Sequence, residues 1–335
     1  MSADDEIKGK LKLNAAIIDR FIDENLQIKT PATLYEASRH LIRAGGKRLR
    51  PYLVMKSCEL VCGNVNNSVP FAAALEVLHN FTLIHDDIMD NDDFRRGVPT
   101  VHTKWGVPIG VASGDLLFSK VYDFIIDAYK LGKISGEGAL ECIERVTDAS
   151  IAICEGQVLD TSFPSMENVS EEEYIDMVGG KTSALFKACA EIGGIVGGAS
   201  KEQIKNLGQF AWDSGIAFQI VDDILGVISD KKTLGKPIGS DLREGKKTII
   251  IIYALQNGTE EENKAIRKVL GVGNASEENI LAATEALKSS GGLDYARGKA
   301  ENYVKQAYSY LDIFRDCEAK EDLKTLIHYF TERLY

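Results

Sequence analysis

Apolar residues recur three and four positions apart along most of the chain, which is the spacing of helices that bury one face. The first such stretch runs from Leu11 to Phe21. Further helices are expected at 34–44, 51–63, 70–90, 108–130, 136–160, 171–190, 202–228, 246–257, 260–270, 276–289, 293–316 and 319–332. The alternation of apolar and polar residues that marks a half-buried strand is not convincing at any position. The pattern therefore predicts an all-α protein.

Local signals refine this prediction. Ser170 followed by Glu173 predicts a capping box at a helix start. The run TIIII at 248–252 has strand-like propensity, but the helical pattern around it favours a buried helix. No low-complexity linker divides the chain, so a single domain of 1–335 is expected. The segment 230–245 is long, polar and rich in glycine and charge, which is typical of a mobile active-site loop.

Charge and composition exclude some classes of function. Lys and Arg number 39 and Asp and Glu number 50, which gives a formal net charge of −11. Such a chain is a poor candidate for general nucleic-acid binding, which needs a basic face. An anionic substrate must instead meet a local group of cations or metal ions. No apolar run approaches a membrane span, and the polar N-terminus is unlike a signal peptide, so a cytoplasmic protein is expected.

The strongest candidate for chemistry is the motif HDDIMDNDDFRRG, which follows an apolar helical stretch. Asp86 and Asp90 are four apart, so both carboxylates project from one face of a helix. Hard oxygen ligands of this kind suit Mg²⁺. Asp87 points about 100° away and is expected to support the pair. Arg95 and Arg96 follow, and guanidinium groups bind phosphate bidentately. The alternative is a solvated acidic helix end.

A second acidic pair makes that alternative less favourable. Asp222 and Asp223 lie in FQIVDDILG, again at the end of an apolar helical stretch. The fifth position of this motif is Gly226 rather than a carboxylate, so it is expected to supply fewer direct metal ligands than the first motif.

Candidate phosphate-binding residues come from four further places. They are Lys47 and Arg50 in GGKRLRP, Lys181 and Thr182 in GGKTS, Lys236, Lys246 and Lys247 in LGKPIGSDLREGKKT, and His79, two helical turns before Asp86. Taken singly, such residues are more often surface lysines or a core histidine than ligands. GGKT is not a phosphate-binding P-loop, because the spacing GxxxxGK[ST] is absent.

Taken in order, these motifs resemble those of the trans-type polyprenyl diphosphate synthases over nearly the entire chain. The resemblance rests on GGKRLRP, LIHDDIMDNDDFRRG, GDLLF (114–118), EGQ (155–157), GGKT, FQIVDDILG and GKPIGSDLREGKKT. It implies a bundle of antiparallel helices around a deep central cavity, usually as a homodimer. It also implies condensation of isopentenyl diphosphate with dimethylallyl, geranyl or farnesyl diphosphate.

The same resemblance implies roles for individual residues. Asp86 and Asp90 would hold magnesium, about three ions per site, with Asp222 facing them and with Asp87 and Asp223 in support. The allylic diphosphate would be surrounded by Arg95, Lys181, Thr182, Gln219, Lys236 and Lys246. Isopentenyl diphosphate would be bound by Lys47, Arg50, His79 and Arg96, with Phe218 nearby. Lys181, Thr182 and Gln219 would act in catalysis, the last two by placing oxygen dipoles near the allylic cation. Gly226 departs from the family, in which many members carry aspartate there.

Product length is implied by the residues just before Asp86. In the family, bulk at the fifth position upstream limits chain growth. This chain has Phe81 at that position and Thr82 at the fourth, with Leu78 nearby. That combination resembles a synthase of geranylgeranyl diphosphate, which has 20 carbons, with farnesyl diphosphate or a mixture as the alternative. A class I terpene cyclase has no use for GGKRLRP and the paired arginines, and a non-catalytic subunit typically lacks the first aspartates or the basic motifs.

Overall fold

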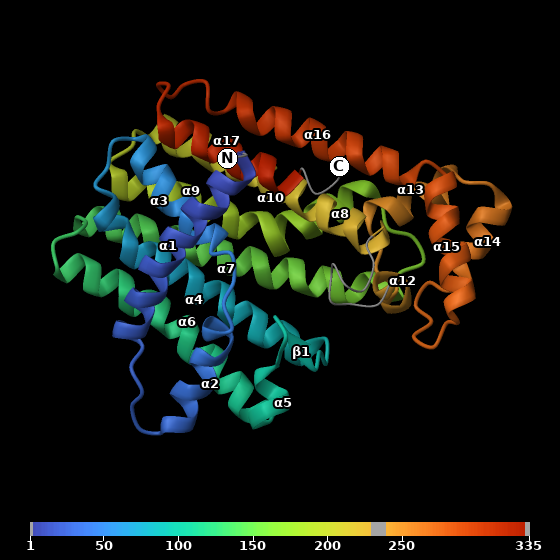
Figure 1. The fold of residues 1–335 in the computed structure, drawn as a ribbon, viewed down its shortest axis with the longest axis horizontal. Helices are drawn as coiled ribbons and strands as arrows, with labels where there is room; N and C mark the ends of the chain where they lie inside the picture. The colour runs from blue at the N-terminus through green and yellow to red at the C-terminus, as the bar shows by residue number, and fades with distance from the viewer. Residues whose placement is uncertain (1–2, 229–238, 332–335) are drawn as a thin grey trace. The chain divides into compact units, whose positions relative to one another are not determined.

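The computed structural model describes residues 3–228 and 239–331, which divide into two compact units. Unit 1 contains the described residues of Met1–Thr147, Ala188–Gly208 and Ile313–Thr325, and unit 2 contains those of Asp148–Lys187, Gln209–Asp312 and Leu326–Tyr335. Helices form nearly all of the regular structure (Figure 1), so the predicted all-α class is confirmed. None of the described helices is long and apolar enough to cross a membrane.

Unit 1 is built around α4 (Val65–Met89). The other helices that lie wholly in this unit are α1 (Ala3–Asn25), α2 (Ala32–Arg43), α3 (Leu49–Leu60), α5 (Val101–Trp105) and α6 (Val107–Lys130). α4 packs against α3 and α6, and every residue from Phe71 to Leu78 is buried. A helix that is buried all round needs apolar residues on every face, which this stretch supplies except at Glu76. The central helix of unit 1 therefore carries the first aspartate motif at its C-terminal end.

A short β-hairpin follows α4 and was not predicted. β1 (Phe94–Arg95) pairs antiparallel with β2 (Val98–Pro99). The two residues between the strands, Arg96 and Gly97, have φ of 53° and 77°. A tight turn of type I′ requires positive φ at both of these positions. The sequence did not reveal these strands, because strands of two residues are too short to show an alternating pattern.

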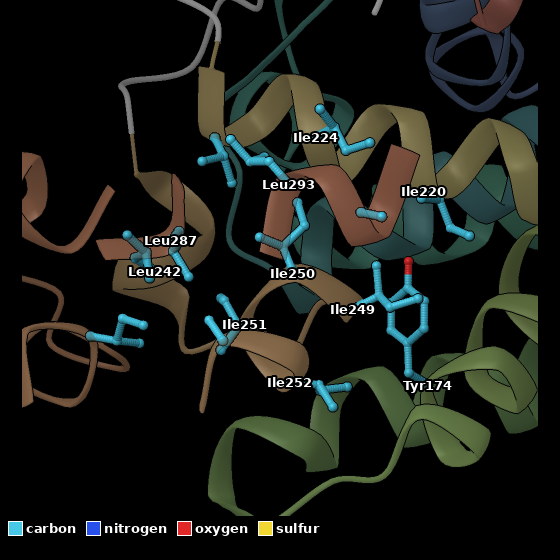
Figure 2. Packing of buried hydrophobic residues seen from close by; sticks show 14 of the residues in the cluster. Tyr174, Ile220, Ile224, Leu242, Ile249, Ile250, Ile251, Ile252, Leu287 and Leu293 are labelled. Atoms are coloured by element: carbon cyan, nitrogen blue, oxygen red, sulfur yellow. The ribbon is translucent and has the colours of Figure 1, made fainter. Parts of the chain in front are cut away.

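Helices of unit 2 surround an isoleucine-rich core. α8 (Glu171–Val178), α12 (Ser240–Glu244), α13 (Ile249–Asn257), α14 (Glu260–Arg267), α15 (Glu277–Ser289) and α16 (Gly292–Ser309) lie wholly in this unit. α7 (Gly136–Ser162), α9 (Ala184–Gly197), α10 (Lys201–Ile228) and α17 (Glu318–Thr331) contribute to both units. Figure 2 shows Ile249–Ile252 of α13 packed with Ile220, Ile224 and Leu293. Burial thus overrides the strand propensity of this run, as predicted.

The predicted helix at 171–190 is wrong in one respect. It begins at the predicted capping box, in which the Ser170 hydroxyl accepts a hydrogen bond from the Glu173 N–H and the Glu173 carboxylate accepts one from the Ser170 N–H. It is then interrupted by a π-helical turn, η2 (Gly179–Ser183), before α9 continues. Two adjacent glycines lower the local preference for α-helix, and π turns of this kind are frequent at functional sites.

The predicted active-site loop at 230–245 falls mainly on residues that are not described. Residues 229–238 lie outside the described residues, and Lys236 is among them. The remaining part forms α12 between Gly239 and Gly245, whose φ values are 74° and 76°. This short helix was not predicted, because five residues are too few to show helical periodicity.

Candidate functional site

The first aspartate motif occupies the C-terminal end of α4. Asp86 and Asp87 lie in the last turn, and Asp90 follows the helix with its N–H donating to the Asp86 carbonyl at 2.8 Å. Unsatisfied carbonyls and the negative end of the helix dipole gather at this end. Three carboxylates here are electrostatically unfavourable unless a cation compensates them. Asp86 is half-buried and Asp90 is exposed, so both are open to such a cation.

Asp87 differs from its two neighbours. It is fully buried and accepts a hydrogen bond from Arg95 Nε, while Arg95 also lies 3.6 Å from an Asp92 carboxylate oxygen. Burial raises the pKa of Asp87 above its usual value, although the Arg95 charge opposes this. Its Oδ2 atom has no hydrogen-bond partner among the residues that the structure describes. These contacts place Asp87 where it orients Arg95, and its expected support of the metal ligands stays a prediction.

Cationic groups of unit 1 gather near His79. Burial, followed by the charges of Arg50 and Arg96, holds the pKa of His79 well below its usual range, so this imidazole is neutral. Arg96 donates through Nη1 to the carbonyl oxygens of Leu41, at 3.1 Å, and Gly45. Lys47 is exposed and precedes the start of α3. Unit 1 therefore contains all the groups expected to bind isopentenyl diphosphate except Phe218.

Phe218 belongs to α10 in unit 2. Its ring packs against Phe186 at 5.7 Å and against Phe330 at 5.2 Å between ring centroids. These contacts show an aromatic cluster, and the expected contact of Phe218 with isopentenyl diphosphate stays a prediction.

Unit 2 contains a pocket of about 460 Å³. Its lining is mainly polar and charged and consists of Asp160, Tyr174, Met177, Val178, Lys181, Thr182, Gln219, Asp222, Asp223, Gly226, Ser240, Asp241, Lys246, Lys247 and Thr248. Every residue predicted from GGKTS and FQIVDDILG to take part in catalysis or metal binding lies in this lining. The pocket thus brings together residues from four segments that are distant in sequence.

A chain of hydrogen bonds fixes the polar wall of the pocket. Thr182 Oγ1 donates to Gln219 Oε1 at 3.0 Å, and Gln219 Nε2 donates to Asp223 Oδ1 at 3.0 Å. Tyr174 donates its hydroxyl to Asp223 Oδ2 at 2.6 Å. Burial raises the pKa of Asp223 to about 7, while these hydrogen bonds act in the opposite direction. Both oxygens of Asp223 therefore orient neighbouring side chains, and its expected support of Asp222 in metal binding stays a prediction.

Two of the three lysines that line the pocket pair with carboxylates. Lys181, on the π turn, pairs with Asp160 of α7. Lys246 lies 3.1 Å from Glu244 Oε2 and 3.9 Å from Asp241 Oδ1. Burial lowers the pKa of Lys246, but the neighbouring carboxylates outweigh it and raise the pKa above its usual value. The Lys246 ammonium group is therefore charged, and both lysines line the pocket where an anionic ligand displaces or extends these pairs.

The EGQ motif allows close packing of α7 against the π turn. A Cβ atom added at Gly156 would lie 2.3 Å from the Lys181 backbone nitrogen and 2.8 Å from the Gly180 carbonyl carbon. Neither atom belongs to a flexible side chain, so the two backbones would have to separate. Because this position is glycine, α7 and the π turn pack closely enough for Asp160 of α7 to pair with Lys181 of the turn.

Replacing Gly156 with alanine is expected to lower stability by about 1–3 kcal/mol and to weaken binding of allylic diphosphates. Thermal unfolding and the KM for farnesyl diphosphate measure these effects. Gly298→Ala is the matched control, because it changes a helical glycine of unit 2 whose added Cβ meets nothing within 4 Å. That control should be neutral or slightly stabilising, since alanine favours helix. Equal behaviour of the two variants would contradict the close-packing role.

Gly226, the fifth position of the second aspartate motif, lies close to a carboxylate of another segment. A Cβ atom at this position would lie 2.7 Å from Asp241 Oδ2.

Within the described residues, no group of three or more His, Cys, Asp or Glu side chains is arranged to hold a metal. Mg²⁺, however, commonly uses one or two carboxylates and completes its shell with phosphate oxygens and water. The carboxylates present therefore fit a magnesium ion that binds together with a diphosphate.

The residues expected to limit product length lie on one face of α4. The Phe81 ring packs against His85 and Phe118, with ring centroids 4.7 and 5.2 Å apart. Phe118 belongs to α6 and the GDLLF motif, and it contacts Tyr122 at 5.4 Å. Phe81 and Thr82 are half-buried, whereas Leu78 is fully buried in the core. Phe81 is therefore part of a row of aromatic rings between α4 and α6.

Several residues of the site were missed by sequence reasoning. Asp160, Tyr174 and Asp241 line the pocket. The Asp241 carboxylate lies close to both Lys246 and Gly226. Asp160 lies one helical turn after the EGQ motif, and this spacing is a signal that sequence reasoning did not use. Tyr174 carries no local signal, because its partner Asp223 is distant in sequence.

Comparison with known proteins identifies the family. The profile of the polyprenyl synthetase family matches residues 31–287. The chain belongs to the polyprenyl synthetase family. Among curated members of this family, it is 41% identical to a geranylgeranyl diphosphate synthase of Methanosarcina mazei, over 100% of this chain and 99% of that protein. It is also 41% identical to a geranylfarnesyl diphosphate synthase of Aeropyrum pernix, over 95% and 99%.

Solved structures of polyprenyl synthetases have the same fold. A geranylgeranyl pyrophosphate synthetase from Pyrococcus horikoshii superposes with a TM-score of 0.91 and 41% identity, covering 98% of this chain and 99% of that chain. A polyprenyl synthase from Caulobacter crescentus, complexed with calcium and isoprenyl diphosphate, gives a TM-score of 0.88 and 30% identity, with 98% of both chains covered. The prediction of this family from ordered motifs is confirmed.

Proposed function

We propose that this polyprenyl synthetase is a magnesium-dependent prenyltransferase that joins isopentenyl diphosphate to allylic diphosphates and makes mainly geranylgeranyl diphosphate. The observation that carries the proposal is the presence of two groups of cationic side chains, one in each unit. One surrounds His79 in unit 1, and the other lines the pocket of unit 2 with Lys181 and Lys246. A condensation needs two diphosphate sites, whereas a terpene cyclase needs one.

The proposed division of roles follows from the side chains. Asp86, Asp90 and Asp222 bind Mg²⁺, with about three ions per site. When bound, magnesium neutralises the charge that develops on the diphosphate leaving group. Arg95 and the lysines 181, 236 and 246 bind the allylic diphosphate. Thr182 and Gln219, whose mutual hydrogen bond fixes their orientation, present uncharged oxygens to the allylic carbons.

Two further parts of the proposal concern the whole protein. Residues 1–335 form one catalytic domain that assembles as a homodimer, and the protein is cytoplasmic. These statements stay predictions, which light scattering and fractionation of cells would test.

A direct assay tests the proposed activity. Purified protein is incubated with radiolabelled isopentenyl diphosphate and dimethylallyl, geranyl or farnesyl diphosphate, with Mg²⁺ or with EDTA. A 20-carbon prenyl diphosphate is expected with Mg²⁺, and no product is expected with EDTA. A cyclic hydrocarbon formed from an allylic diphosphate alone would instead indicate a terpene cyclase. Absence of product from every primer would indicate a non-catalytic subunit.

The two cation groups are expected to serve different substrates. Lys47→Ala should raise the KM for isopentenyl diphosphate at least about tenfold, because it removes a charge-assisted hydrogen bond, and should change the KM for farnesyl diphosphate little. Lys181→Ala should show the reverse pattern. Steady-state kinetics with each substrate varied in turn measures both constants. Equal weakening of both substrates by both variants would refute this division.

A further inference from the structure

Arg48 lies among the cations of unit 1 but differs from them in its surroundings. It is only 3% exposed, although it stands between the exposed Lys47 and the half-buried Arg50. Its φ of 50° and ψ of 42° put it in the left-handed region, which disfavours residues other than glycine. A strained backbone of this kind persists only where surrounding contacts hold it.

The guanidinium of Arg48 makes those contacts with three helices. Its Nε donates to Asp19 Oδ1 of α1 at 2.8 Å, and its Nη1 donates to Glu76 Oε1 of α4 at 2.7 Å. Its Nη2 donates to the carbonyl oxygen of Ile42, near the end of α2, at 2.6 Å. Glu76 is itself 2% exposed, so this is a buried ion pair. Because all three of its side-chain nitrogens donate to protein atoms, Arg48 is not arranged to bind a substrate itself.

The same contacts connect the groups proposed to bind isopentenyl diphosphate. Glu76 lies one turn before His79 on α4, so the buried pair fixes that turn against the loop that holds Lys47. The Gly45 carbonyl accepts hydrogen bonds from both Arg48, at 3.3 Å, and Arg96. The two guanidinium groups approach Gly46 closely, since an added Cβ there would lie 3.1 Å from an atom of each.

We propose that Arg48 is a positioning residue for isopentenyl diphosphate: its planar fork sets the places of Lys47, Arg50, His79 and Arg96 without touching the substrate. The identity of the ligand rests on the proposed function. Loss of the fork breaks the simultaneous hydrogen bonds to Asp19, Glu76 and the Ile42 carbonyl and releases the strained turn. The phosphate-binding groups then lose their pre-organised arrangement, and binding weakens although each group is still present.

The test uses Arg48→Lys in the full-length protein, which keeps the charge but loses the fork. Calorimetry measures the Kd for isopentenyl diphosphate alone, and kinetics measures the KM for farnesyl diphosphate. We expect the Kd to rise at least about tenfold, because a small misplacement of binding groups is costly, while the KM for farnesyl diphosphate changes less than about twofold. Arg48→Ala should regain binding when guanidinium ions are added.

Arg39→Lys is the matched control. Arg39 is 8% exposed and pairs with Asp23 of α1, so it is also a buried arginine held by that helix. The Arg39→Lys variant should have a lower melting temperature than the wild type and should bind isopentenyl diphosphate as tightly as the wild type does. If a folded Arg48→Lys binds isopentenyl diphosphate as the wild type does, or weakens both substrates equally, the positioning role is wrong. If the wild type itself neither binds nor condenses isopentenyl diphosphate, the proposed function fails instead.

Discussion

Asp86→Ala and Asp90→Ala each lower kcat/KM at least about 100-fold, and the double variant is nearly inactive while it remains folded. This is the expected result if the two carboxylates hold magnesium against a diphosphate. Both residues lie at the negative end of the α4 dipole, where carboxylates repel one another and the helix carbonyls. The melting temperature should therefore stay close to the wild-type value or rise. A large loss of activity without a loss of stability separates a metal ligand from a structural residue.

Asp93→Ala is the control for this experiment. Asp93 is an exposed carboxylate three residues after Asp90, and its backbone carbonyl accepts a hydrogen bond from the Thr100 N–H at 2.9 Å. It should retain activity within about twofold, as surface substitutions usually have small effects. Circular dichroism and thermal unfolding confirm folding, and activity is measured over a range of Mg²⁺ concentrations. Near-normal turnover by the folded double variant would refute the metal assignment.

Phe81→Ala is expected to change the product rather than the rate. The phenyl ring fills the space between His85 and Phe118, and its removal opens a volume at the proposed end of the growing chain. Products longer than 20 carbons should then predominate. Reversed-phase chromatography of the dephosphorylated products separates them by length. The wild-type enzyme, assayed with the same primers, should give mainly the 20-carbon product.

The effect of removing the Phe81 ring must be distinguished from a general loss of packing around α4. Phe71→Leu provides the comparison, because Phe71 lies ten residues earlier on the same helix and is fully buried in the core. It should lower stability and leave product length unchanged. An unchanged product from Phe81→Ala would mean that another residue limits chain growth, and the assignment of a 20-carbon product would lose its main structural support.

Sequence reasoning predicted most of the helices because their apolar faces repeat over many turns. It also predicted the capping box at Ser170, since both partners lie within one turn of each other. It missed the hairpin at Phe94–Pro99 and the break at Gly179–Ser183. Each spans too few residues to create, or to interrupt, a regular spacing of apolar residues. Local pattern therefore predicts where helices lie more readily than where they are broken.

The candidate site shows the same limit. Adjacent residues such as Asp222 and Asp223 were predicted together, but their different surroundings depend on Tyr174, which is distant in sequence. Arg48 and Lys47 are both basic residues of the GGKRLRP motif. Arg48 is buried in an ion pair, whereas Lys47 is exposed. Burial and pairing of this kind arise from contacts between helices and leave no mark on the local sequence.

The π turn at Gly179–Ser183 also constrains how this protein can tolerate changes in length. A π turn contains roughly one residue more than an α-helical turn. Deleting one residue from GGKTS would allow α8 and α9 to join as a regular helix, but every later residue would turn by about 100° about the helix axis. Ala184 and Phe186, which are now buried, would then face other directions. A deletion that improves the local helix would therefore be selected against by the packing that follows it.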